Sequence, residues 1–137
     1  MMKAEFGMKR LGHGLPALLA AAFLLSANTM VLAQTAGEML HACQALQRGM
    51  RVTGNTAFLP SGTEAQQCWG FMSAVQEYSV LADQAGTRLL NACPAVDTKT
   101  TQILDVFVKY ANAHRDKLDT PAAAVAYNAM AVAFPCP

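Results

Sequence analysis

The feature that most constrains this chain of 137 residues is its set of four cysteines, Cys43, Cys68, Cys93 and Cys136. An even number of cysteines in a small exported domain usually forms disulfides, because such a domain buries little surface and gains much stability from cross-links. In a cytosolic protein the same residues would more often bind a metal or take part in catalysis. The compartment therefore decides what these cysteines do.

The N-terminus predicts export. Basic residues precede an apolar run from Leu15 to Leu25, and Val31-Leu32-Ala33 supplies a small-residue cleavage site. This order is typical of a secretory signal peptide. We expect residues 1–33 to be a signal peptide cleaved after Ala33, and residues 34–137 to form one small periplasmic domain. An uncleaved anchor would need about 20 continuous apolar residues, and Ser26, Asn28 and Thr29 interrupt this run. The expected mature part has no further run of that length, so we expect no membrane contact after cleavage.

Apolar spacing predicts four helices in the expected domain. Apolar side chains recur at intervals of three and four residues, which is typical of a helix with one buried face. The predicted segments are roughly 36–48, a second after Pro60, a third after about Asp97 and a fourth after Thr120 that ends at Pro135. Their expected N-terminal residues are caps or a first-turn proline: Ser61 and Thr63 for the second, Asp97 and Thr98 for the third, and Thr120 with Pro121 for the fourth. No segment shows the alternation of a strand. We therefore predict an all-α fold, a small disulfide-linked bundle of about four helices.

The order of these helices favours one cysteine pairing. Four cysteines allow three pairings, and the sequence itself leaves all three open. Short connections favour antiparallel neighbours. The start of the third helix then lies near the end of the fourth, which brings Cys93 to Cys136. A hairpin of the first two helices brings Cys43 to Cys68. These are the two disulfides that we predict.

The stretch CWGF at 68–71 raises the alternative of a papain-type nucleophile. A cysteine peptidase needs a histidine base beside its thiolate. Downstream of Cys68 the sequence offers only His114, which we expect at a helix C-terminus, where a basic residue compensates the helix dipole. The sequence has no CxxC or HxxxH pair to indicate a zinc site. We expect no catalytic residue, no metal and no cofactor.

The charge balance gives no indication of a nucleic-acid partner. The chain has 10 Lys and Arg against 9 Asp and Glu, and several of its basic residues precede the apolar run. A nucleic-acid-binding domain would show a basic patch or stripe. We therefore expect no nucleic-acid binding.

Several stretches, taken together, resemble a known family. They are HACQ at 41–44, CWGFMSAV at 68–75, NACPAVDTKT at 91–100, VFVKYANAH at 106–114 and TPAAAVAYNAMAVAFPC at 120–136. Their order, spacing and position behind a signal peptide resemble the Tai/Rap family of type VI secretion amidase immunity proteins. The most specific pieces are residues 68–72 and 133–136. The chain departs from the family at His114-Arg115, where members often have His-Pro.

The resemblance implies a periplasmic, helical, disulfide-linked protein, in many members a homodimer, that binds and blocks a peptidoglycan amidase injected by a competing cell. Those amidases are similar to cysteine peptidases, so the catalytic thiol would belong to the partner. We expect this chain to be an inhibitor and not an enzyme. The alternative is another periplasmic role on the same scaffold, such as an acid-stress chaperone of the HdeA type.

Two connectors are candidates for the partner-binding surface. One spans residues 51–62 and holds Phe58 and Leu59 among turn residues, and the other spans residues 114–120, with His114 at its start and Leu118 as its apolar residue. Exposed apolar side chains in a cluster often mark a binding site. The alternative is that Phe58 and Leu59 pack back onto the first two helices, and that residues 114–120 form a solvated turn.

Overall fold

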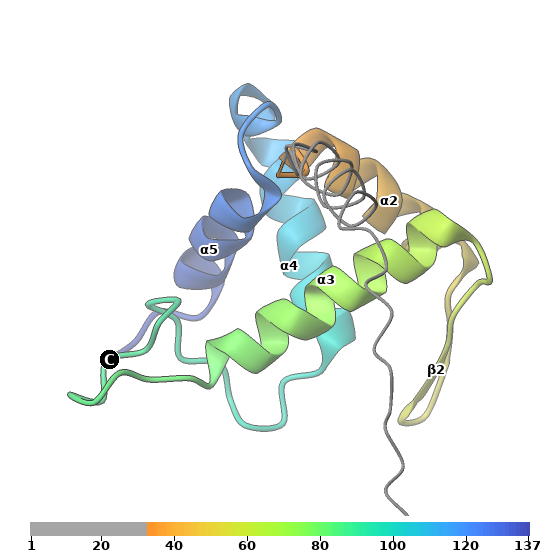
Figure 1. Cartoon of the computed structure of the whole chain (residues 1–137). Coiled ribbons are helices and arrows are strands. Elements are labelled where there is room, and N and C mark those ends of the chain that lie inside the picture. The colour runs from red at the N-terminus through yellow and green to blue at the C-terminus, as the bar shows by residue number, and fades with distance from the viewer. Residues whose placement is uncertain (1–32) are drawn as a thin grey trace, which may run out of the picture. The chain divides into compact units, whose positions relative to one another are not determined.

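A computed structural model describes residues 33–137. The predicted signal peptide lies outside these residues, except for Ala33. The described part contains four α-helices, α2 (Ala36–Gly49), α3 (Thr63–Ser79), α4 (Thr100–Ala113) and α5 (Ala122–Ala133), labelled as in Figure 1. A hairpin of β1 (Arg51–Thr53) and β2 (Thr56–Phe58) connects α2 to α3, and a 3-10 turn, η1 (Arg115–Lys117), follows α4. Among residues 33–137, no helix is long and apolar enough to cross a membrane.

The hairpin corrects the predicted all-α class, although the four helices are confirmed. Residues Arg51, Val52 and Thr53 pair antiparallel with Phe58, Ala57 and Thr56. Gly54 has a φ of +59° at the first position of the two-residue loop, a conformation that glycine adopts without strain and that a type II′ turn requires there. The prediction failed because strands of three residues are too short to show alternating polarity.

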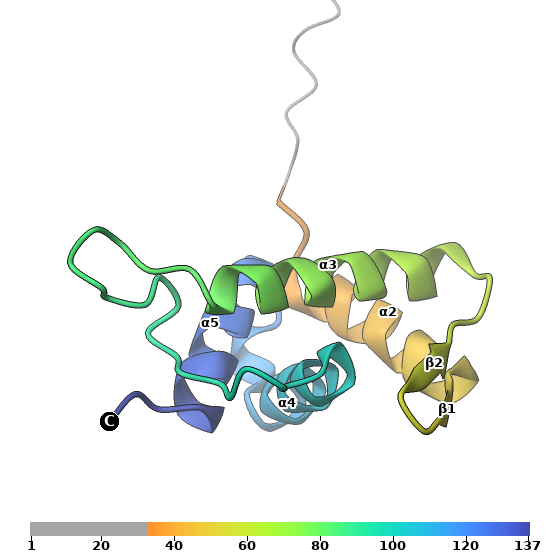
Figure 2. The same cartoon turned by 90° about the horizontal axis from the view of Figure 1, so that it is seen from below.

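The hydrophobic core lies where the four helices meet. α2 packs most extensively against α3, and α4 against α5, while α2 and α3 also contact α4. Figure 2 shows α4 nearly end-on where α3 lies across the view, so these two helices cross steeply and are not antiparallel neighbours. The largest fully buried side chains come from the apolar faces of all four helices: Met39, Leu46, Met72, Ile103, Leu104, Phe107, Val125 and Met130.

The two disulfides have the pairing expected from the helix order. Cys43–Cys68 joins α2 to α3, and both residues are fully buried. Cys93–Cys136 joins the irregular segment that follows α3 to the C-terminal tail, and Cys136 is exposed. The amide of Cys93 also donates a 2.8 Å hydrogen bond to the carbonyl of Phe134. One disulfide therefore links helices inside the core, and the other links two irregular segments at its edge.

The helix N-termini differ from most of the predicted caps. The N-cap of α3 is Gly62, which has no side chain to cap the helix. The side-chain amide of Gln66 donates to the carbonyl of Pro60. The expected capping boxes of Ser61 and Thr63 are therefore wrong. The N-cap of α4 is Lys99 and not the predicted Asp97 or Thr98.

The remaining two helices begin side by side. Thr35 forms a capping box with Glu38 at the start of α2. Pro121 is the N-cap of α5 and not its first helical residue, while the Thr120 hydroxyl donates to the carbonyl of Lys117. The amide of Ala122 donates to the carbonyl of Gln34, so the chain before α2 is hydrogen-bonded to the start of α5.

Candidate partner-binding site

Cys68 is not available as a nucleophile. Its sulfur is bonded to Cys43, and the residue is 0% exposed between α2 and α3. Within residues 33–137 there is no free cysteine. The CWGF stretch is therefore part of a core helix, where Cys68 holds α3 to α2.

The two histidines of the described part lie in different settings. His41 is exposed on α2, with Nδ1 3.6 Å from a carboxylate oxygen of Glu64 on α3. His114 is the C-cap of α4, its ring stacked on Tyr110 at 3.9 Å between centroids and its Nδ1 2.8 Å from the Tyr110 carbonyl. Neither histidine faces a thiol, and among residues 33–137 no group of three acidic, histidine or cysteine side chains is placed to hold a metal ion.

The first predicted connector, residues 51–62, is the hairpin and its return to α3. β1 is exposed at all three residues and β2 at two of three. Phe58 is 58% exposed at the end of β2, whereas Leu59 packs against the core cluster. The sequence grouped these two neighbours together, but in the structure Leu59 packs against the core and Phe58 faces solvent.

Both ends of the hairpin are held by the domain. Met50 and Leu59, which flank the two strands, pack against the core. A Cβ at Gly49 would lie only 2.9 Å from two ring carbons of Pro60, so the chain ends approach closely where the hairpin leaves the helices. The Lys99 ammonium donates to the side-chain oxygen of Asn55 in the hairpin turn. The hairpin is thus fixed at its base and at its tip.

The second predicted connector, residues 114–120, is more involved in the fold. Leu118 packs against the core, and its carbonyl accepts a 2.8 Å hydrogen bond from the amide of Gly37 in the first turn of α2. His114 stacks on Tyr110 as described above. Figure 1 shows this connector and the hairpin at different ends of the domain, so the structure does not bring the two candidate regions into one site.

An apolar groove is a surface that the sequence analysis missed. It lies between α3, the segment after it and α5, with a volume of about 270 Å³. Its lining is almost entirely apolar: Phe71, Ala74, Val75, Tyr78, Leu90, Ala123, Ala126 and Tyr127. Apolar periodicity shows that each helix has an inward face, but it does not show where two such faces leave a gap, so no sequence pattern indicates this groove.

Comparison with known proteins identifies the family. A family model described as "Rap1a immunity proteins" matches residues 35–136. No curated protein and no solved structure matches the chain. The match begins at the Thr35 cap of α2 and ends at the disulfide cysteine Cys136, so it includes all four helices and both disulfides. The chain belongs to the Rap1a immunity protein family, a family of type VI secretion immunity proteins.

Proposed function

We propose that this protein is exported to the periplasm, where it binds and neutralises a type VI secreted peptidoglycan amidase. The observation that carries the proposal is the match of an immunity family across residues 35–136, the whole described fold. Both disulfides support an oxidising compartment, because the cytosol keeps most protein thiols reduced.

The geometry supports inhibition by binding and not by chemistry of the protein's own. In the described part every cysteine is in a disulfide, and the histidines are paired with a carboxylate or a tyrosine. A cross-linked domain of this kind offers a rigid surface, and rigidity lowers the entropy lost on binding. A partner with a cysteine-peptidase-like site would supply the catalytic thiol.

Phe58, Leu59, His114 and Leu118 remain the proposed partner-binding residues, with different weight. Phe58 is the one whose side chain the domain leaves exposed. Leu59 and Leu118 pack against the core, and His114 stacks on Tyr110. Leu59 would hold the hairpin in place, and His114 and Leu118 would do the same for the second connector at the other end of the domain.

The test is protection of living cells. A panel of type VI peptidoglycan amidases is directed one at a time to the periplasm of a susceptible strain, with and without co-production of the full chain. We expect lysis by at least one amidase to be prevented by the full chain and not by a form lacking residues 1–33, which would stay in the cytoplasm. Lysis by every amidase despite production of folded, exported protein would show that the proposal is wrong. An added assay of aggregation at acidic pH would then test the chaperone alternative.

A further inference from the structure

One face of the hairpin, called the outer face below, is a small surface of exposed residues. Arg51 lies directly opposite Phe58, and Thr53 lies opposite Thr56. Residues opposite each other in an antiparallel pair project to the same face, and successive residues alternate. Arg51, Thr53, Thr56 and Phe58 therefore share one face.

The other face of the hairpin is turned partly toward the helices, with Val52 still 57% exposed. Val52 and Ala57 line a depression together with Trp69 of α3 and Lys99 and Thr100 at the start of α4. The face of Arg51 and Phe58 consequently points away from the helices. Figure 2 shows the hairpin at the edge of the domain, beyond the end of α2.

This outer face combines an exposed aromatic ring with unpaired positive charge. Phe58 is 58% exposed. Arg51 on this face is exposed, as is Arg48 in the last turn of α2, and within residues 33–137 neither lies within ion-pair distance of a carboxylate. Between Glu38 and Glu64 the sequence contains no acidic residue, so no carboxylate on the hairpin or on its two flanks offsets these cations.

Aromatic and arginine side chains are the types that most often dominate binding energy at an interface. Charge on such a surface steers the approach of a partner of opposite sign. The base of the hairpin is fixed by Met50, Leu59 and the close approach of Gly49 to Pro60. Its outer face is therefore already ordered before a partner binds, which lowers the entropy lost on binding.

We infer that the outer face of the hairpin, with Phe58 and Arg51 as its anchors, is the surface that docks on the effector, and that it fits an acidic surface with an apolar hollow for the phenyl ring. This inference rests on the proposed function, since it takes the partner to be the amidase. The apolar groove beside Tyr127 is a weaker candidate, because it carries no charge and nothing in the structure shows what covers it.

The test measures binding to the amidase that the wild-type chain neutralises in cells, with the catalytic cysteine of that amidase replaced by alanine. Phe58→Ala is expected to raise Kd about 30-fold at all salt concentrations, as loss of a dominant anchor does. Arg51→Glu is expected to raise Kd about tenfold or more at low salt and to reduce the salt dependence of binding.

Matched controls place the same changes elsewhere on the surface. Lys109→Glu makes a comparable charge reversal at an exposed position of α4, and Tyr127→Ala removes an exposed ring at the groove. Both should bind as the wild type does. Melting curves should show that all four variants are folded.

The possible outcomes separate the two proposals. If the wild-type chain binds and the hairpin variants bind equally well, the docking inference is wrong and the proposed function stands. If Lys109→Glu or Tyr127→Ala loses binding instead, a different face docks. If the wild-type chain binds no amidase of the panel, the proposed function fails and the inference fails with it.

Discussion

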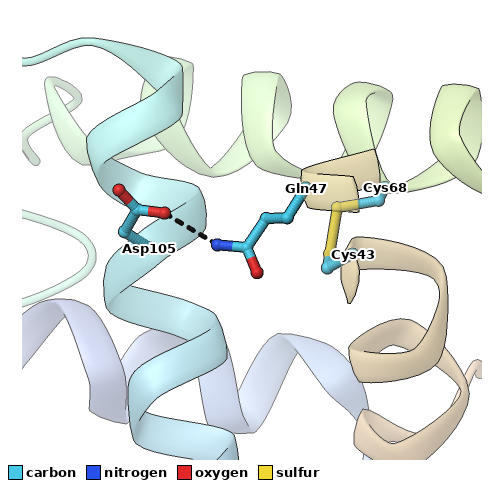
Figure 3. Close-up of a disulfide and its surroundings, with 4 residues drawn as sticks. All are labelled: Cys43, Gln47, Cys68 and Asp105. Atoms are coloured by element: carbon cyan, nitrogen blue, oxygen red, sulfur yellow. Dashed lines mark hydrogen bonds between the residues drawn. A yellow bond between two sulfur atoms is a disulfide. The ribbon is translucent and has the colours of Figure 1, made fainter. Parts of the chain in front are cut away.

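The side-chain amide of Gln47 donates a 2.7 Å hydrogen bond to the carboxylate of Asp105 (Figure 3). Gln47 lies in α2, four residues after the disulfide cysteine Cys43. The bond links α2 to α4, whereas the disulfide links α2 to α3. The same stretch of α2 is thus tied to α3 by a covalent bond in the core and to α4 by a polar contact at its edge.

This polar contact predicts coupling between Gln47 and Asp105. Gln47→Ala and Asp105→Ala should each lower the free energy of unfolding by about 1 kcal/mol, because a net hydrogen bond contributes about that much. The double variant should lose little more than either single one, which urea denaturation would measure as a double-mutant cycle. Losses that simply add would mean that the hydrogen bond does not stabilise the protein in solution.

The two disulfides are expected to respond differently to a reductant. Cys43–Cys68 is fully buried, while Cys136 of the second disulfide is exposed. A dithiol should therefore reduce Cys93–Cys136 first, because thiol–disulfide exchange requires access to the sulfur atoms. Timed alkylation followed by peptide mass mapping would follow the order. Earlier labelling of Cys43 and Cys68 would contradict the burial described here.

Loss of the buried disulfide should strongly destabilise the domain. Cys43→Ser and Cys68→Ser are each expected to lower the free energy of unfolding by roughly 3–4 kcal/mol on the chain-entropy estimate. The double variant should be little worse than either single one, since both remove the same bond. Thermal melting of the three variants measures this, and strictly additive losses would contradict the pairing.

Glycine substitutions test the base of the hairpin. Gly49→Ala places a methyl group 2.9 Å from Pro60, so we expect a loss of about 1 kcal/mol from the forced shift. Gly70→Ala is the matched control: it lies inside α3, and its Cβ would meet nothing within 4 Å. It should stabilise the domain by about 0.5–1 kcal/mol through helix propensity. Equal effects of the two substitutions in urea denaturation would show that the Gly49–Pro60 approach is not close in solution.

The Thr35 cap connects the start of the described fold with the predicted cleavage site. Cleavage after Ala33 would leave both Thr35 and the Gln34 carbonyl that pairs with Ala122. N-terminal sequencing of the periplasmic form should therefore begin at Gln34 or within a few residues. Thr35→Ala should cost about 1 kcal/mol of stability, as loss of an N-cap does. A mature form that begins beyond Glu38 would lack the whole capping box and contradict this account.

The helices were predictable because each has a continuous apolar face. Met39 and Leu46 of α2, and Ile103 and Phe107 of α4, recur at helical spacing and are buried as that spacing indicates. The caps were less predictable, because several polar residues stand near each helix start and tertiary contacts choose among them. At α3, for instance, Gly62 became the cap while Ser61 and Thr63 did not.

The candidate site was only partly predictable, for a related reason. The sequence indicated that residues 51–62 hold apolar side chains outside the helices, but not that Leu59 would turn inward and Phe58 outward. The register of the hairpin sets Phe58 opposite Arg51, and Leu59, the residue just after β2, packs against the core. Register depends on the turn at Gly54 and on the fixed base, and both appear only when the chain is folded.

Whether this domain blocks an amidase can be measured by titrating the purified protein into an active peptidoglycan amidase from the protection assay and following peptidoglycan hydrolysis. We expect hydrolysis to fall with added protein until it is abolished near saturation. Cleavage of the protein itself should not accompany inhibition, and much more of the Phe58→Ala variant should be needed for the same effect. Full hydrolysis in the presence of a large excess of folded wild-type protein would contradict the claim that this domain acts by binding and blocking an amidase.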